Sequence, residues 1–255
     1  MSELLPIDGQ VRRYDWGGED FIATLLGEPA GGGPVAEYWL GAHPDSPSVV
    51  RTAAGPVPLD ALVDEDPPRW LGRRHATAFG HWPHLLKVLD VARPLSIQVH
   101  PDREQARAGF AQEEALGVPR KAPQRNFHDP NPKPELAVAL SPFWLLFGLA
   151  PDAVLIRHLE SHPSLTELAV LARAQGGAAV FRRVLEADDA TLAAWLVPVL
   201  EAARSSGVTD RAAPAFWVNR WLGAAPPAER VDRGVFGFLL MNILELAPGA
   251  GIFQG

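Results

Sequence analysis

The sequence predicts a mainly β protein with added α-helix, in which a β-domain is interrupted by an all-helical segment. Residues 1–58 hold short apolar runs separated by turns that contain Gly and Pro, which is typical of strands and hairpins. From Pro151 the apolar residues recur with the spacing of helices, and partial alternation returns from Val235. We therefore expect a β-domain over residues 1–150, a helical insertion over 151–230 that ends at Pro226-Pro227, and a return to the β-domain over 231–255.

The composition restricts the class of protein and the chemistry it can carry. The 255 residues are 47% hydrophobic and 21% charged, which is enough to bury a sizeable core. The chain has no cysteine, so any metal must be held by nitrogen and oxygen ligands. The net charge of −7 argues against a nucleic-acid partner, although clustered Lys and Arg can still bind a phosphorylated small molecule. With no signal peptide and no apolar run of the roughly 20 residues that span a bilayer, we expect no membrane partner and a cytoplasmic protein, a monomer or weak oligomer.

Short elements are predicted along the first 90 residues. They are a helix at Phe21–Leu26, strands at Val35–Ala42 and from Val49, and helical spacing over residues 59–79 that is broken at Pro67 and Pro68. His81 and His84 are interpreted as loop histidines, because Pro83 between them denies the helical geometry that a ligand pair would need.

Residues 95–101, Leu-Ser-Ile-Gln-Val-His-Pro, alternate between apolar and polar side chains. As a strand, this run would place Ser96, Gln98 and His100 on one inward face. Together with Glu135, which follows a Pro-rich extended segment, Gln98 and His100 make a possible three-ligand metal set. The alternative is a hydrogen-bonded core histidine beside a surface carboxylate, and spacing alone leaves both interpretations open.

Helix signals dominate the rest of the chain. Asp102 is predicted to cap a helix that runs through Ala115, followed by a surface loop over 118–131 with a solvent-facing His128. Further helices are expected at residues 152–160, 164–175, 178–187, 189–206 and 212–222, with a capping box at Ser164–Glu167 and a cap at Asp189. His158 and His162, four residues apart, are interpreted as part of a solvated face.

Several short blocks, in order along the whole chain, resemble the type I mannose-6-phosphate isomerase (phosphomannose isomerase) family. They are Tyr14–Gly17, Ala36–His43, Leu85–Leu89, Leu95–Pro101 and Lys133–Glu135, with later similarity at Gly234–Gly237 and Leu246–Gly249. The resemblance implies a cupin-type jelly-roll β-domain that carries an inserted helical domain. It also implies a zinc-dependent aldose–ketose isomerase that interconverts mannose 6-phosphate and fructose 6-phosphate through an enediol.

The resemblance also implies roles for individual residues. One zinc ion per chain would be held by Gln98, His100 and Glu135. The sugar or its phosphate would be contacted by Lys87, Ser96 and Lys133, with Trp16 at the pocket rim; catalysis by Lys133 as a proton shuttle is one option, and a residue beyond Gly255 is the other. The chain departs from the family at Pro132, where a histidine is usual. The sequence assigns no general base.

The family's second zinc histidine and a catalytic arginine lie beyond the position of Gly255, so we expect the chain to be truncated at its C-terminus. This expectation leaves open a non-catalytic or degenerate cupin homologue that binds sugar phosphate without turning it over. A cupin oxygenase would instead predict a His-x-His pair, and Gln98 in the first position argues against it.

Overall fold

The computed structural model describes residues 4–29, 31–225 and 230–254, and the chain divides into two compact units, Met1–Leu95 and Ser96–Gly255. Helix makes up 43% and strand 20% of the described residues, so this part of the chain is mixed α/β and not mainly β as expected. Helices outside the predicted insertion contribute to this excess. The three-part division made from the sequence stays a prediction, and its Pro226-Pro227 end lies outside the described residues.

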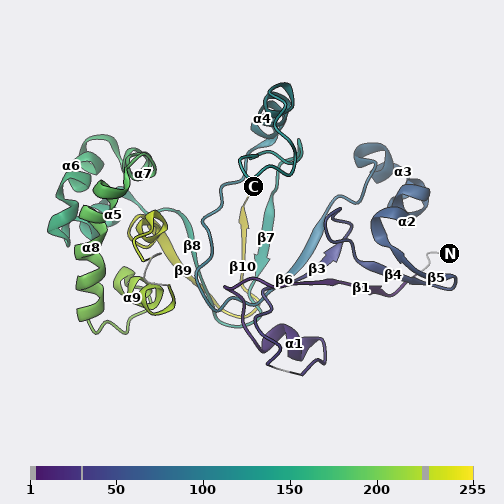
Figure 1. Ribbon diagram of the computed structural model, residues 1–255, viewed down its shortest axis with the longest axis horizontal. Coiled ribbons are helices and arrows are strands. Elements are labelled where there is room, and N and C mark those ends of the chain that lie inside the picture. Colours follow the sequence, from purple (N-terminus) through teal and green to yellow (C-terminus); the bar gives the residue numbers. More distant parts are fainter. Residues whose placement is uncertain (1–3, 30, 226–229, 255) are drawn as a thin grey trace. The chain divides into compact units, whose positions relative to one another are not determined.

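The first unit contains two antiparallel three-stranded sheets, with strand orders β1-β4-β5 and β2-β3-β6 (Figure 1). Its strands are β1 Ile7–Asp8, β2 Gln10–Arg12, β3 Glu37–Gly41, β4 Val49–Thr52, β5 Gly55–Pro58 and β6 Leu85–Leu89, and its helices are α1 Phe21–Leu25, α2 Leu59–Glu65 and α3 Pro67–Phe79. The central strand β3 buries Glu37, Trp39 and Gly41 and leaves the two residues between them partly exposed, which is the period of a pleated strand. The predicted strands and short helix of this region are confirmed.

The double proline of the first unit begins a helix. Asp66 accepts a hydrogen bond from the backbone N–H of Arg69, and Pro67 occupies the first helical position, where no intrahelical N–H is needed. Gly72 interrupts α3 with a φ of 74°, a left-handed conformation that glycine adopts readily. His81 and His84 lie in the loop before β6, as predicted.

The second unit contains two antiparallel strand pairs and most of the helices of the described chain (Figure 1). Its strands are β7 Glu135–Val138, β8 Phe143–Leu149, β9 Met241–Leu246 and β10 Gly251–Gln254, with β7 paired to β10 and β8 to β9. Its helices are α4 Arg103–Ala115, α5 Asp152–Glu160, α6 Thr166–Gln175, α7 Gly177–Leu185, α8 Asp189–Ser205, α9 Pro214–Ala224 and α10 Phe236–Leu240, with 3-10 turns η1 Pro163–Leu165 and η3 Arg233–Val235.

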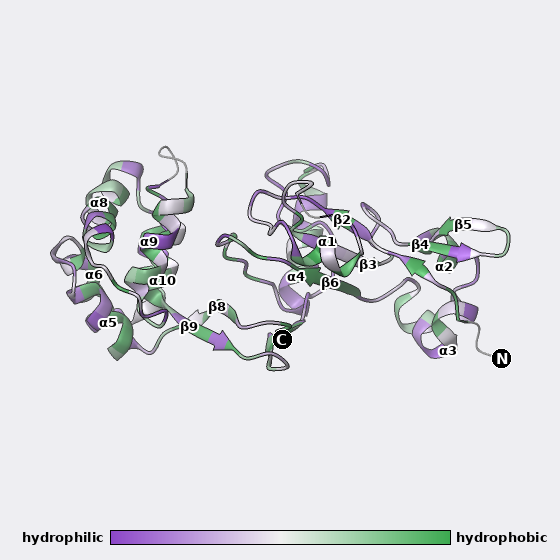
Figure 2. Cartoon of the chain, turned by 90° about the horizontal axis from the view of Figure 1, so that it is seen from below, coloured by the Kyte–Doolittle hydropathy of each residue, from purple (hydrophilic) through white to green (hydrophobic). Residues whose placement is uncertain are grey.

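Helices α5 to α10 pack around one apolar core, whose fully buried members include Leu155, Leu196, Phe236 and Leu240. Figure 2 shows apolar and polar residues mixed along α5, α6 and α8, the pattern of helices with one buried face. The helices predicted after Pro151 are confirmed with small shifts of their ends. None of the helices among the described residues combines the length and apolarity that a membrane crossing requires.

Two predicted helix caps in the second unit are wrong. The Ser164 hydroxyl donates to the carbonyl oxygen of Trp195 instead of capping α6. Asp188, not Asp189, caps α8 by accepting a hydrogen bond from the N–H of Thr191. Both predicted residues are of types that cap helices. Packing against α8 directs the Ser164 hydroxyl away from α6, and at α8 the capping residue lies one position earlier than predicted.

Three further expectations about the second unit need correction. Residues 236–240, expected to alternate as β structure, form α10, and all five residues are buried in the helical core. His158 and His162 are partly buried and not solvated, and His158 Nδ1 lies 3.0 Å from the carbonyl oxygen of Leu239. The loop over 118–131 is only partly a surface loop, because Arg125 within it is buried.

Candidate functional site

Residues 95–101 do not form a strand among the described residues, contrary to the prediction. A strand needs a hydrogen-bonded neighbour, and alternation of side chains does not supply one. Ser96 and Gln98 are exposed instead of facing inward, whereas the His100 side chain is only 17% exposed. The segment is therefore a loop that exposes Ser96 and Gln98 and partly buries His100.

His100 is oriented by a backbone carbonyl. Its Nδ1 lies 2.9 Å from the carbonyl oxygen of Lys133. Because a carbonyl oxygen only accepts hydrogen bonds, the neutral ring carries its proton on Nδ1 and leaves the lone pair of Nε2 free. Metal-binding histidines usually have such a partner on their other ring nitrogen, because it fixes the tautomer and the ring orientation.

Glu135 lies beside this histidine. It is the first residue of β7, its Oε1 is 3.8 Å from Nδ1 of His100, and its side chain is 58% exposed. The structure thus brings together two of the three predicted metal ligands. The third, Gln98, is exposed two residues before His100 and makes no hydrogen bond within the described part of the chain.

The donor set fits zinc in chemistry. An imidazole nitrogen, a carboxylate oxygen and an amide oxygen are N and O donors of the kind that a chain without cysteine must use. No group of three or more His, Cys, Asp or Glu residues is placed to hold a metal among the described residues. A three-ligand site at His100 and Glu135 therefore requires a neutral donor, which is the part predicted for Gln98.

Lys133 contributes to this region in two ways. Its backbone carbonyl holds His100, and its ammonium group lies 3.8 Å from Oδ2 of Asp129. The lysine side chain is about half exposed, so it can exchange the carboxylate for another anion at low cost. Its catalytic role stays a prediction.

Lys87 belongs to a charged and aromatic cluster in the first unit. It lies on β6 directly opposite Trp39 of β3, with its Nζ 4.7 Å from the centroid of that ring. The same Nζ is 3.9 Å from Oε1 of Glu37, whose other oxygen accepts a 2.6 Å hydrogen bond from Nε1 of Trp39. Sequence reasoning did not select Glu37 or Trp39, although a carboxylate within an apolar strand is a signal that a buried partner exists.

Trp16, also in the first unit, stacks on Tyr14 with ring centroids 5.6 Å apart. Its backbone carbonyl accepts hydrogen bonds from the N–H groups of Ala92 and Arg93. The tryptophan is partly exposed, as a side chain at a pocket rim would be. The substrate-binding roles of Trp16, Lys87 and Ser96 stay predictions.

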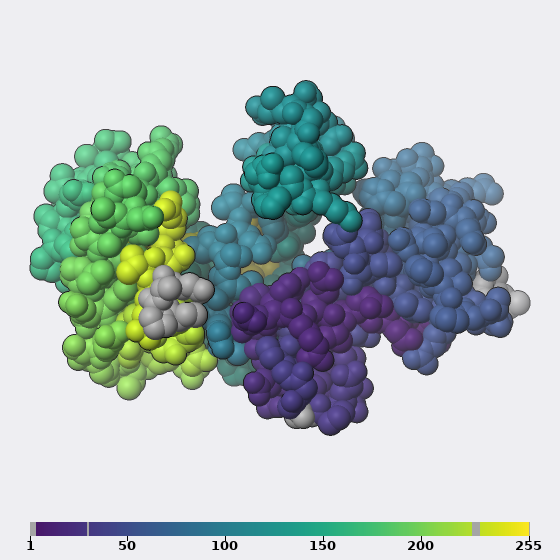
Figure 3. All heavy atoms as spheres, viewed as in Figure 1, coloured from purple at the N-terminus to yellow at the C-terminus, as the bar shows by residue number. Residues whose placement is uncertain are grey.

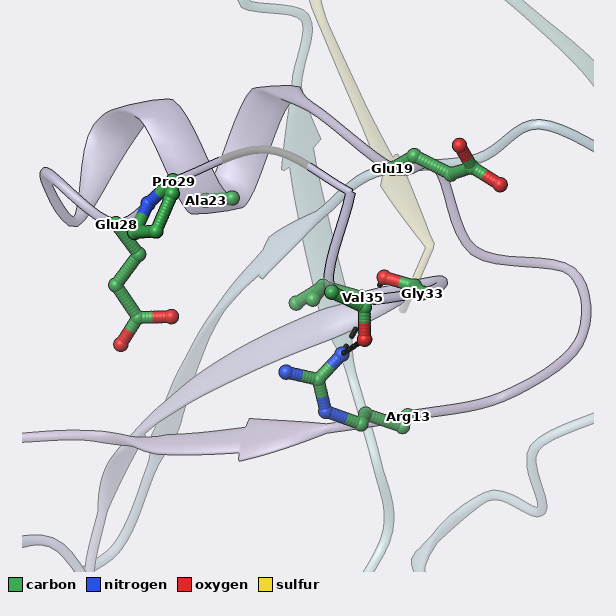
Figure 4. A pocket seen from close by; sticks show the side chains of 8 residues that line it. Arg13, Glu19, Ala23, Glu28, Pro29, Gly33 and Val35 are labelled. Carbon is green, nitrogen blue, oxygen red and sulfur yellow. Dashed lines mark hydrogen bonds between the residues drawn. The ribbon is translucent and has the colours of Figure 1, made fainter.

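A cavity of about 230 Å³ in the first unit contains none of the predicted site residues. It lies between α1 and the segment before β3, where Arg13 Nη1 donates to the carbonyl oxygens of Gly32 and Gly33 at 3.1 and 3.3 Å (Figure 4). Glu19 and Glu28 lie at its edge. The guanidinium of Arg13 therefore already donates to backbone oxygens of the segment before β3.

Comparison with known proteins identifies relatives of the whole chain. The profile of the phosphomannose isomerase type I catalytic domain matches residues 4–151. A mannose-6-phosphate isomerase of Shigella flexneri is 34% identical over 259 residues, covering 99% of this chain and 63% of that protein. A zinc-bound crystal structure of mannose 6-phosphate isomerase is similar with a TM-score of 0.83 at 32% identity, over 98% of this chain and 63% of that one.

A second solved structure adds a bound sugar phosphate. Mannose 6-phosphate isomerase from Salmonella typhimurium, bound to its substrate fructose 6-phosphate and to zinc, is similar with a TM-score of 0.83 at 31% identity. The alignment covers 98% of this chain and 63% of that structure's chain. The chain therefore spans 63% of the length of these bacterial relatives and solved structures.

Proposed function

The chain belongs to the type I phosphomannose isomerase family, and on that premise we propose that it serves a zinc-dependent isomerase that interconverts mannose 6-phosphate and fructose 6-phosphate. Relatives with this name match 99% of the chain, and similar solved structures hold zinc and fructose 6-phosphate. The proposal includes a cupin-type jelly roll with a helical insertion, and a monomer or weak oligomer. A cytoplasmic address is in keeping with the absence of cysteine.

The observation that carries the proposal is the hydrogen bond between His100 Nδ1 and the carbonyl oxygen of Lys133. It joins two sequence blocks that the family resemblance had selected separately. In the proposed site Gln98, His100 and Glu135 hold zinc, and His100 binds through the free lone pair of Nε2. A zinc ion at this place supplies Lewis-acid polarisation of the sugar oxygens.

The remaining residues bind and orient the substrate. The reaction moves a proton between C1 and C2 of the open-chain sugar, so the sugar must be held in one orientation throughout. Lys87 and Ser96 donate hydrogen bonds to the sugar or its phosphate, and Trp16 provides an apolar rim. Lys133 carries a transferable proton on Nζ. When substrate binds, the ammonium group leaves the Asp129 carboxylate and pairs with the substrate.

The test is to measure bound zinc and isomerase turnover in the same preparation. We expect about one zinc per chain, conversion of mannose 6-phosphate to fructose 6-phosphate, and loss of turnover with EDTA that added Zn²⁺ restores. If the protein binds zinc and sugar phosphate but shows no turnover, it is a degenerate binding homologue and not an isomerase. Turnover that persists after complete removal of the metal would contradict the zinc site.

A further inference from the structure

Arg125 is the one positively charged residue among the buried residues of the described chain. Its side chain is 0% exposed, and all of its polar contacts are to protein groups of one small region. Nη1 donates to the carbonyl oxygen of Val118 at 2.6 Å, Nε to that of Phe127 at 2.7 Å, and Nη2 to Oε1 of Glu114 at 2.8 Å. Oε2 of Glu113 lies 3.0 Å from Nε. A fork of several donors in fixed directions is what distinguishes arginine from lysine.

The two carboxylates come from the last turns of α4, where the helix dipole disfavours negative charge. The two carboxylates are useful at this position because they bind groups of the loop that follows α4. Glu113 accepts hydrogen bonds from the backbone N–H groups of Asn126 and Phe127 at 3.0 and 2.8 Å. The bond from Asn126 is the main reason why the pKa of Glu113 lies below its ordinary value. We call residues 118–128 the α4 loop, and these contacts fasten it to the helix.

A second, apolar contact supports the same attachment. A Cβ atom on Gly109 of α4 would lie 2.4 Å from the ring of Phe127, so the absence of a side chain lets the ring approach the helix. Glycine within a helix is unfavourable by about 1 kcal/mol relative to alanine, and the contact accounts for its use here. In Figure 3 the teal atoms of α4 and its loop gather into one compact body.

The α4 loop leads directly into the candidate metal site. Nδ1 of His128 lies 2.8 Å from the carbonyl oxygen of Arg120, which closes the loop on itself. The next residue, Asp129, pairs with Lys133, and the carbonyl oxygen of Lys133 holds His100. The short run of backbone from Phe127 to Glu135, with these contacts along it, therefore connects the buried guanidinium to the candidate ligand Glu135.

We propose that Arg125 is a positioning residue of the site: it holds the α4 loop against α4 and thereby sets where the segment carrying Lys133 and Glu135 begins. The inference rests on the proposed function for the roles of those two residues. It predicts that loss of the guanidinium weakens the metal site without contact between Arg125 and the metal.

The chain offers a matched control in Arg120. It approaches the same Glu114 carboxylate at 3.4 Å and lies over the same Phe110 ring, 5.2 Å from its centroid against 5.1 Å for Arg125. However, its side chain is 64% exposed, and an exposed ion pair contributes little. Arg120→Met therefore removes an equal charge from the same cluster and leaves the buried contacts in place.

The experiment compares Arg125→Met with Arg120→Met by competition of the protein with a zinc chelator and by steady-state kinetics on mannose 6-phosphate. For Arg125→Met we expect a raised KM and zinc affinity reduced by about tenfold, the lower end of the loss that follows removal of a direct hydrogen-bond partner of a metal ligand, because Arg125 acts on the ligand segment only through the loop. For Arg120→Met we expect both quantities within about twofold of wild type. A folded Arg125→Met with wild-type zinc affinity and KM would overturn the proposal.

Glu113→Gln provides a second variant that leaves the guanidinium in place. It turns an acceptor oxygen into an NH₂ group that faces the N–H donors of the loop, so it should loosen the same attachment and weaken zinc binding in the same direction. Amide hydrogen exchange over residues 126–136 should become faster in both variants. Faster exchange confined to 118–128, with zinc affinity unchanged, would contradict the proposal. A wild-type protein that neither binds zinc nor converts mannose 6-phosphate would instead refute the proposed function. In that case the rate of amide hydrogen exchange at residues 133–136 in the variants would still decide whether Arg125 positions this segment.

Discussion

His100 Nδ1 lies 2.9 Å from the carbonyl oxygen of Lys133, which joins two residues 33 positions apart in the sequence. This hydrogen bond determines the tautomer of the imidazole and leaves Nε2 free as a ligand atom. It also places the start of β7, where Glu135 lies, beside the loop that ends in His100. The geometry of the candidate site therefore depends on backbone placement as much as on side-chain identity.

We expect His100→Asn to reduce zinc affinity by at least about tenfold, since it removes the Nε2 ligand atom while its amide NH₂ group can still donate to the carbonyl oxygen of Lys133. His128→Asn is a suitable control, because His128 is exposed and its Nδ1 makes the same kind of contact, 2.8 Å from the carbonyl oxygen of Arg120. Zinc titration of both variants checks the expectation. Equal losses in the two variants would mean that His100 is not a ligand.

Trp39→Phe should destabilise the first unit because it deprives the buried Glu37 carboxylate of a 2.6 Å hydrogen bond. Trp82→Phe is the matched control, since the Nε1 of Trp82 is buried in the same unit without a hydrogen-bond partner in the described structure. Both substitutions delete the same atoms. We expect Trp39→Phe to cost about 1–3 kcal/mol more than Trp82→Phe in urea unfolding, the value of a hydrogen bond to a charged group. Similar losses would show that the carboxylate does not need this donor.

The stability of the second unit should fall as the pH drops below about 6.5, the ordinary pKa of histidine. Burial, with a smaller effect from His158, lowers the pKa of His162 in the folded chain. The unfolded chain therefore takes up this proton at a higher pH than the folded chain does. The corresponding stability is present above about pH 6.5 and is lost as the pH falls through the lower folded pKa. In urea unfolding at pH 7.5, 6.5 and 5.5, His162→Gln should show a weaker pH dependence than wild type. An unchanged dependence would assign the effect to other groups.

The parts of the fold that depend on local chemistry were predictable from the sequence. Asp102 caps α4 as expected, and the bond is reciprocal: Asp102 accepts from the N–H of Gln105, whose side chain accepts from the N–H of Asp102. The helices after Pro151 follow from their apolar spacing in the same way. In these cases neighbours in the sequence determine the outcome.

The parts that depend on distant partners were not predictable. The alternation of residues 95–101 indicated a strand, but no neighbouring strand pairs with it among the described residues. Arg125 looked like one charge in a surface loop, and its burial follows from carboxylates on α4 that the loop reaches only after it has turned back. For the site, residue types predicted Gln98, His100 and Glu135, whereas the contact of His100 with a backbone carbonyl carries no sequence signal.

The contact between Gly109 and Phe127 makes a sharper prediction, because two effects of one substitution have opposite sign. Gly109→Ala favours the helix by about 0.5–1 kcal/mol, but its new Cβ would lie 2.4 Å from the Phe127 ring, which must move away from α4. In a Phe127→Ala background the ring is absent, so Gly109→Ala should stabilise the protein by the full helix-propensity term. In the wild-type background the gain should be cancelled or reversed, which gives a coupling of about 1 kcal/mol or more in a double-mutant cycle measured by urea unfolding. Equal effects of Gly109→Ala in the two backgrounds would show that the ring does not rest on the helix at this glycine.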